Sequence, residues 1–304
     1  MSSIDTLKRI LPAPLQKYIR RIRKRWRVSQ RAEMKATLPT FGEDDFRDLL
    51  TSRLRIGRGD VVFVHSGFGQ IYATFAPGRV IDILLEVVGP SGTLLFPTFP
   101  TVSSSEFLQE GTVHDVRRTR SGMGVVTELA RKRPGSTRTA HPVRSVCGIG
   151  PQFHDLVKDQ LSTPYFYDDL TPFFRLVRVA GKVIGLGVGS ERCSFVHTAD
   201  DHLKGDFPVV PYLPELYRAR CIDANGREFE FQTYAHDMSR MNHDVPKLMK
   251  TWVAPAIGED LTHLGRRFFR ADCAPLFDAL VQLAREGKTI YAPAVYKPGR
   301  VATH

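Results

Sequence analysis

Two apolar runs, Val61-Val62-Phe63-Val64-His65 and Thr93-Leu94-Leu95-Phe96-Pro97, stand on either side of a segment that opens with Ala76-Pro77 and carries apolar residues at helical spacing. Glycine-containing turns, Gly57-Arg58-Gly59 and Gly89-Pro90-Ser91-Gly92, separate the three pieces. Short apolar runs bounded by glycine are typical of buried strands. A strand, a helix and a second strand in this order favour a parallel pair joined by a crossover helix. The segment therefore predicts an α/β fold.

The same alternation continues outward from this segment. We expect further helices over 41–54, 123–132 and 274–286, a buried strand over 182–186 and a short strand over 289–291. Asn225-Gly226 lies between two segments in which apolar and polar residues alternate. This predicts a tight hairpin, because Asn and Gly readily adopt the positive φ angles of a two-residue turn. The pattern is that of an α/β sandwich with a small β-hairpin elaboration in its C-terminal part.

The basic charge of the chain is concentrated at its N-terminus. Of a net +11, residues 1–35 contribute eleven basic and two acidic side chains, so the remainder is nearly balanced. Apolar residues are interleaved with these charges, and such a segment suits an anionic membrane surface or, equally, packing as a solvated basic helix. No nucleic-acid motif accompanies the charge, so we expect no nucleic-acid partner.

Other features of the sequence exclude several classes of protein. The chain of 304 residues is 42% hydrophobic, and it contains neither a run of about 20 apolar residues nor a signal-peptide core, so we expect a cytoplasmic protein, with peripheral inner-membrane association left open. The four cysteines are widely spaced and predict no zinc ribbon. Gly185-x-Gly187-x-Gly189 departs from the dinucleotide fingerprint, and Gly287-Lys288-Thr289 lacks the first glycine of a phosphate loop.

A hydroxyl, an imidazole and two carboxylates gather after the strand at 182–186. They belong to Ser194, His197, Asp200 and Asp201, and residues three or four apart share a helix face. A base beside a hydroxyl and an orienting carboxylate is typical of acyl-transfer sites. The same groups are also ordinary ligands of zinc or iron, although no HExxH motif is present, and a satisfied structural histidine is a further reading.

Six segments, read in order, resemble the aminoglycoside 3-N-acetyltransferase family. The resemblance runs from about Gly59 to Leu283, and the segments are Gly59–Ser66, Gly89–Phe99, Gly122–Glu128, Arg138–Gly150, Thr171-Pro172 and Ser194–Asp200. It implies a three-layer α/β/α sandwich with a largely parallel or mixed sheet, and transfer of an acetyl group from acetyl-CoA to an amine of an amino sugar or aminoglycoside. We accordingly expect residues 1–40 to form a basic amphipathic extension and 41–304 an acetyltransferase domain with a β-rich insertion near 205–235.

The resemblance implies roles for individual residues. His197 is expected to act as the general base, with Asp200 as its partner and Ser194 facing the charge that develops on the thioester; Asp201 is a second choice for the carboxylate. The coenzyme-binding residues implied are His65, Ser66, Pro97, Thr98, Phe99, Met123, Gly124 and His141. For His141 a structural role in a turn is equally open. Direct transfer is expected, with Cys193 a packing residue, and no metal is expected.

The acceptor and the assembly stay open at this stage. Asp200 and Ser194 stand where the family usually has Glu and Thr, and the tail and the span 204–234 look unlike the antibiotic-modifying members. An acidic cleft for a polycation would draw on Asp168, Asp169, Asp200, Asp201 and Asp206. The alternatives are an amino sugar on a nucleotide or lipid carrier for surface polysaccharide, a non-catalytic relative that binds CoA or glycan, and a metal-dependent hydrolase. A homo-oligomer is compatible with the sequence.

Overall fold

A computed structural model describes Glu33 and residues 36–299. The chain forms two compact units, Met1–Thr40 and Phe41–His304, and only the second is described in full apart from its last residues. The expected basic amphipathic helix at the N-terminus lies outside the described residues. Among those that are described, no helix is both long and apolar enough to cross a membrane.

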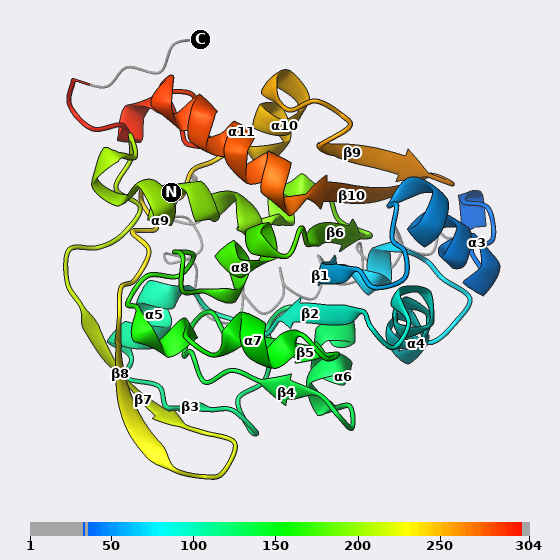
Figure 1. Ribbon diagram of the computed structural model, residues 1–304, viewed down its shortest axis with the longest axis horizontal. Helices are drawn as coiled ribbons and strands as arrows, with labels where there is room; N and C mark the ends of the chain where they lie inside the picture. Colours follow the sequence, from blue (N-terminus) through cyan, green and yellow to red (C-terminus); the bar gives the residue numbers. More distant parts are fainter. Residues whose placement is uncertain (1–32, 34–35, 300–304) are drawn as a thin grey trace, which may run out of the picture. The chain divides into compact units, whose positions relative to one another are not determined.

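The second unit is organised around a seven-stranded mixed sheet. From top to bottom of Figure 1 the strands run in the order β9-β10-β6-β1-β2-β5-β4. The central three, β2, β1 and β6, are parallel, and the outer pairings are antiparallel. The strand bounds are β1 Val61–Ser66, β2 Thr93–Pro97, β4 Thr137–Arg138, β5 Val146–Ile149, β6 Lys182–Leu186, β9 Gly258–His263 and β10 Arg266–Asp272.

Helices cover both faces of this sheet. Alternating side chains of β1 divide between the two faces, with Val62 and Val64 in one core and Val61 and Phe63 in the other, as the period of two in a strand requires. The first core is closed by α3 (Glu43–Asp48), a π-helical turn (Leu49–Arg53), α4 (Pro77–Val88) and α6 (Val125–Lys132). The second is closed by α5 (Ser104–Gln109), α7 (Phe153–Val157), α8 (Pro172–Arg178), α9 (Thr198–Leu203), α10 (Val245–Trp252) and α11 (Cys273–Arg285). The expected three-layer α/β/α sandwich with a mixed sheet is confirmed.

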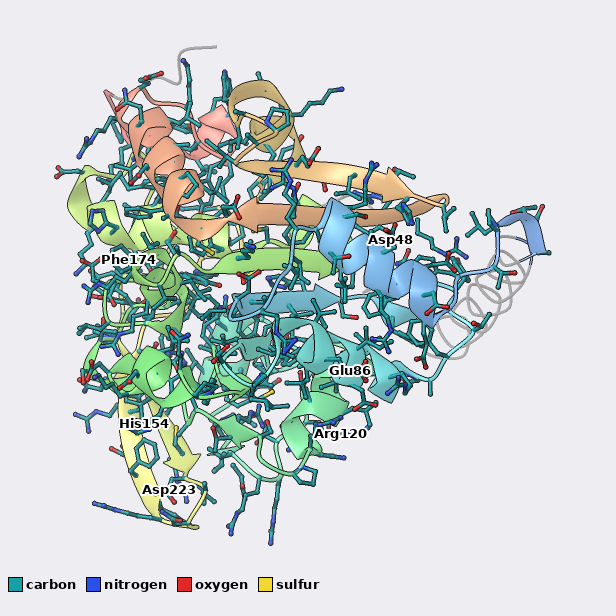
Figure 2. The ribbon with its side chains drawn as sticks, turned by 45° about the vertical axis from the view of Figure 1, so that its right-hand side comes forward. Asp48, Glu86, Arg120, His154, Phe174 and Asp223 are labelled. Carbon is teal, nitrogen blue, oxygen red and sulfur yellow. The ribbon has the colours of Figure 1, made fainter. Side chains whose placement is uncertain are left out.

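A separate three-stranded sheet carries the predicted hairpin. Its order is β3-β7-β8, with β3 at His114–Asp115, β7 at Tyr217–Ile222 and β8 at Glu228–Thr233. Asp223 lies at the tip of this hairpin (Figure 2), where its carboxylate accepts the backbone N–H groups of Asn225 and Arg227. The predicted hairpin is therefore confirmed, but its turn spans Asp223–Gly226 and places only Gly226 at positive φ (+87°), so it differs from the expected two-residue Asn-Gly turn. The strand expected over 289–291 is reduced to one bridge between His243 and Tyr291.

Asp201 holds one loop of the second core in place. Its carboxylate is 2% exposed and accepts the backbone N–H groups of Phe166 and Tyr167 at 3.1 and 2.7 Å and the Tyr212 hydroxyl at 2.6 Å. Buried carboxylates are tolerated when several donors satisfy them. Asp201 thus fixes the segment before α8 against α9, and these contacts give it a structural role.

We expect Asp201→Ala to lower the free energy of unfolding by about 3 kcal/mol, because two buried N–H groups and a tyrosine hydroxyl lose their acceptor. Urea denaturation of the whole chain measures it. The control is Asp169→Ala, which removes a half-exposed carboxylate paired with His202 and is expected to cost less than about 0.5 kcal/mol. Equal losses for the two variants would contradict the anchoring role of Asp201.

Candidate active site

The residues after β6 form two turns of 3-10 helix followed by a short α-helix. Ser190–Arg192 and Ser194–His197 are the 3-10 turns, and α9 begins at Thr198. The chain enters them through Gly187, which has φ +70° and whose Cα lies so close to the Gly67 carbonyl that a Cβ there would come within 2.7 Å of it. Only glycine meets both demands without strain. Of the residues predicted to share a helix face, His197 and Asp200 face each other one turn apart. Asp201 turns instead to the backbone of residues 166 and 167, and Ser194 contacts His65.

A hydrogen-bonded triangle joins His197, Asp200 and Tyr291. His197 Nδ1 lies 2.9 Å from Asp200 Oδ2 and 3.1 Å from the Tyr291 hydroxyl, which itself donates to Asp200 Oδ2 at 2.5 Å. In the active form, where the Asp200 carboxylate is ionised and only accepts, Nδ1 carries the imidazole proton and Nε2 keeps its lone pair. The unprotonated nitrogen of the His197–Asp200 pair is therefore His197 Nε2.

Burial controls the charge of this triangle. Desolvation, reinforced by the Arg144 guanidinium, lowers the pKa of His197 to about 3. Desolvation also raises the pKa of Asp200, an effect that the hydrogen bond from Tyr291 opposes. Both shifts disfavour charge in the resting site, as expected for groups removed from water. The imidazole is accordingly neutral and able to accept a proton at neutral pH.

His197 opens onto a cavity of about 340 Å³. His65, Phe99, Met123 and Ser194, all expected at the coenzyme or the reaction centre, line this cavity together with His197. Ser194 Oγ lies 3.4 Å from His65 Nε2, at the limit of a hydrogen bond. The structure thus brings together the ends of β1, β2 and β6, which are far apart in the sequence.

The remaining residues predicted to bind the coenzyme do not line the His197 cavity. Gly124, with φ +101°, caps α6 close to the Ser66 carbonyl, and the Ser66 hydroxyl is buried with no hydrogen-bond partner. Pro97 ends β2, and the Thr98 hydroxyl donates to Ser145. Neither of these two is among the residues that line the cavity.

His141 has a structural position. Its Nδ1 accepts the backbone N–H groups of Val143 and Arg144 at 3.3 and 3.1 Å, and its ring packs edge-on against Phe166 and Phe231. It does not line the His197 cavity. Of the two readings left open for His141, these contacts favour the turn.

Several residues of the site come from places that the motifs did not mark. Arg144, Tyr167, His236 and His243 all line the cavity. The His236 and His243 rings lie 5.7 and 5.5 Å from the His197 ring, centroid to centroid, and Tyr167 lies 5.3 Å from it. Arg144 stands directly before Ser145 in a family-like segment, which was the one local signal available. The two histidines lie in an irregular stretch with no periodicity to mark them.

The acidic cleft expected for a polycation is not formed by the five aspartates named for it, none of which lines the His197 cavity. Asp200 and Asp201 instead border a different cavity, in the company of Lys204, Arg240 and Lys297. Asp168 accepts hydrogen bonds from the Thr163 hydroxyl and a backbone N–H. Asp168, Asp200 and Asp201 thus serve internal contacts, and Asp169 pairs with His202 at the surface.

Cys193 is not poised to act as a nucleophile. Burial raises the pKa of the Cys193 thiol to about 12, so the nucleophilic thiolate is scarce at neutral pH. Within residues 36–299 no three His, Cys, Asp or Glu side chains are grouped as metal ligands.

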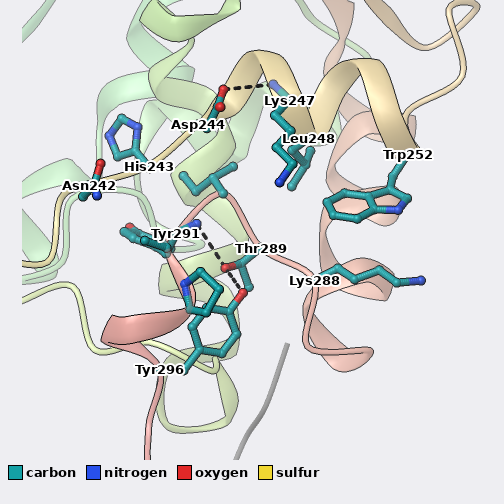
Figure 3. Close-up of a pocket in the computed structure, with 13 residues that line it drawn as sticks. Asn242, His243, Asp244, Lys247, Leu248, Trp252, Lys288, Thr289, Tyr291 and Tyr296 are labelled. Atoms are coloured by element: carbon teal, nitrogen blue, oxygen red, sulfur yellow. Dashed lines mark hydrogen bonds between the residues drawn. The ribbon is translucent and has the colours of Figure 1, made fainter. Parts of the chain in front are cut away.

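A further cavity, of about 290 Å³, shares His243 with the His197 cavity and is also lined by Tyr291. Figure 3 shows the Trp252 indole on the side opposite His243, with Lys247 between them. The carboxylate of Asp244 accepts the backbone N–H of Lys247 and so caps α10. This neighbour is aromatic and basic in character.

Comparison with known proteins places this geometry in a family. The model described as "Aminoglycoside 3-N-acetyltransferase" matches residues 63–284. The aminoglycoside N(3)-acetyltransferase VIII of Streptomyces fradiae is 30% identical over 51% of this chain and 58% of its own length. The type IV enzyme of a Salmonella species is 28% identical over 58% of this chain and 66% of its own. The chain thus spans about three fifths of the length of the curated relatives that it matches.

Solved structures share the fold. A structure of aminoglycoside acetyltransferase AAC(3)-Xa superposes with a TM-score of 0.69 and 23% identity, covering 85% of this chain and 96% of that one. A structure described as AAC-IIIb in a binary complex with CoASH gives a TM-score of 0.67 at 19% identity, over 84% of this chain and 100% of that one. Since the family model covers well over half of the residues and includes both the sheet and the His197–Asp200 pair, the chain belongs to the aminoglycoside 3-N-acetyltransferase family.

Proposed function

We propose that this chain is an acetyl-CoA-dependent N-acetyltransferase that acetylates an amine of an amino sugar or an aminoglycoside. The observation that carries the proposal is the buried His197–Asp200 pair, 2.9 Å apart, at the wall of a cavity. Family membership supports the reaction class, and the geometry supports the assignment of roles.

The chemistry requires a base because only a neutral amine attacks a thioester. In the proposed step the amine nitrogen bonds to the acetyl carbon, its proton passes to His197 Nε2, and the carbon–sulfur bond breaks to release the CoA thiolate. Asp200 then faces the imidazolium through Nδ1, and the opposite charges stabilise each other at 2.9 Å. Tyr291 holds the carboxylate in place through its 2.5 Å hydrogen bond.

The other end of the cavity suits the thioester. His65, Ser66, Phe99, Met123 and Gly124 lie at the ends of β1 and β2 and the start of α6, and we assign the coenzyme to this side. The Ser194 hydroxyl, which lies 3.4 Å from His65 Nε2 in the cavity that His197 also lines, is assigned to donate to the carbonyl oxygen as it gains charge. Direct transfer is favoured over an acyl-enzyme because the buried Cys193 thiol stays protonated.

We expect His197→Ala to reduce kcat/KM for amine acetylation by at least about 100-fold, the lower end of what a positioned general base supplies. Release of free CoA thiol in the presence of an amine acceptor measures the rate. The matched control is His202→Ala, five residues on, where the imidazole pairs with Asp169 at the surface and is expected to leave the rate within about twofold. Near-normal turnover by His197→Ala would remove His197 from the mechanism.

The burial of His197 and Asp200 should determine how kcat/KM depends on pH. Since the pKa of His197 is lowered far beneath its ordinary 6.5 and that of Asp200 is raised above its ordinary 3.8, loss of activity on acidification reflects protonation of Asp200, not of the imidazole. We expect the acid limb of kcat/KM to lie on the alkaline side of 6.5, to stay in place for acceptors whose amines differ in pKa, and to vanish in Asp200→Asn. A limb near 6.5 that persists in Asp200→Asn would show that His197 titrates as an ordinary imidazole.

A further inference from the structure

We infer that the acceptor of this chain carries a negatively charged group, a phosphate or a carboxylate, close to the amine that is acetylated, and that the Arg144 guanidinium binds this group. The inference rests on the proposed function and narrows its substrate class. It departs from a polycationic acceptor.

The Arg144 side chain is held rigidly at the wall of the His197 cavity. Its guanidinium carbon lies 4.5 Å from the Phe166 ring centroid and 4.9 Å from that of Phe99. Nε donates to the Tyr167 hydroxyl at 2.8 Å and Nη1 to the Val143 carbonyl at 2.8 Å. Aromatic rings and neutral acceptors therefore fix its position without cancelling its charge.

No carboxylate among residues 36–299 forms an ion pair with Arg144, which is unusual for a half-buried guanidinium. Three of its five N–H groups have partners, the third being His236 Nδ1 at 3.1 Å from Nη2. Two N–H groups are left for a ligand. A planar guanidinium with donors to spare fits a carboxylate or phosphate, which accepts two parallel hydrogen bonds.

The rest of the cavity has the same sign of charge. Its lining residues include two arginines, Arg144 and Arg192, and a single acid, Glu191. Both oxygens of Glu191 are already engaged, one by the Gly189 N–H at 3.2 Å and the other by Arg267 at 2.9 Å. The surrounding histidines, His65, His197, His236 and His243, have pKa values lowered by burial, so they add no charge at neutral pH and no attraction for a cation.

The neighbouring cavity, which shares His243, is also lined by basic side chains. Lys247 lines it together with Lys288, which pairs with Glu286 at 2.8 Å, and its one acid, Asp244, is committed to capping α10 (Figure 3). An acceptor with several ammonium groups would thus meet cations on both sides of His243, and like charges brought together oppose binding.

The position of Arg144 relative to the base fits one sugar unit. Arg144 contacts His236, whose ring centroid is 5.7 Å from that of His197. An anionic group on Arg144 and an amine at His197 can therefore belong to the same ring or to adjacent atoms of one acceptor. The anion would also fix the orientation of the amine before transfer.

The test compares ligands that differ only in charge. Isothermal titration of the full chain uses glucosamine, glucosamine 6-phosphate and 2-amino-2-deoxyglucuronic acid, which share the amine and differ in an added phosphate or carboxylate. We expect at least one anionic sugar to bind about tenfold or more tightly than glucosamine, in the range measured for desolvated charge pairs. Comparing the two anionic sugars decides between phosphate and carboxylate.

Variants assign the preference to Arg144. Arg144→Gln should abolish the preference for the anionic sugars, and Arg144→Lys should retain part of it because the charge remains. The matched control is Arg178→Gln, which removes the same charge from an exposed arginine stacked on Phe174 and should keep the full preference. If Arg144→Gln weakens all three sugars alike, its role is structural and the inference is overturned.

Binding and turnover separate this inference from the proposed function. Equal affinities for the three sugars, no binding of either anionic sugar, or tighter binding of kanamycin, a polycation, would overturn the anionic acceptor even if amines are acetylated. An anionic preference that depends on Arg144, with no acetyl transfer to any amine, would instead uphold the binding site and contradict the transferase.

Discussion

Desolvation of one histidine–carboxylate pair is the constraint on which the site depends. His197 and Asp200 are 6% and 4% exposed, and ionising either group alone in that environment costs free energy. Because both groups are buried, the attraction between an imidazolium and the carboxylate is stronger than it would be at the surface. Tyr291 completes the arrangement by holding the carboxylate that would otherwise be only partly satisfied.

The scaffold serves this pair through rigid neighbours. The parallel strands β1, β2 and β6 end at one edge of the sheet, which brings His65, Phe99 and Ser194 to one cavity. Asp201, adjacent in sequence to Asp200, ties down the loop that carries Tyr167. Two neighbouring aspartates thus do different work, because their helix turns Asp200 toward His197 and Asp201 toward the backbone of residues 166 and 167.

Local patterns predicted the parts of the fold that local physics decides. The buried strands, the crossover helix and the Asn-Gly hairpin follow from periodicity and turn chemistry, and the His197–Asp200 pair follows from helical spacing. The β9–β10 hairpin escaped because its turn is Leu264-Gly265, with Leu264 at φ +47°, a conformation rarely adopted by leucine. Tyr291 and His236 escaped because they reach the site through packing between segments remote in the chain, which no local pattern records. Arg144 lies within the segment Arg138–Gly150, but nothing in that segment indicated that its side chain lines the cavity.

The central claim is that His197 is a neutral, buried base whose Nδ1 carries the proton. Nitrogen-15 NMR of histidine-labelled protein, with His197 assigned by its absence from His197→Gln, reads the protonation of both ring nitrogens directly. From about pH 5 to 8 we expect the ring to stay neutral, because burial holds its pKa far below this range, and its proton to lie on Nδ1 once Asp200 is ionised. An imidazolium that titrates near 6.5, or a proton on Nε2 while Asp200 is ionised, would contradict the account.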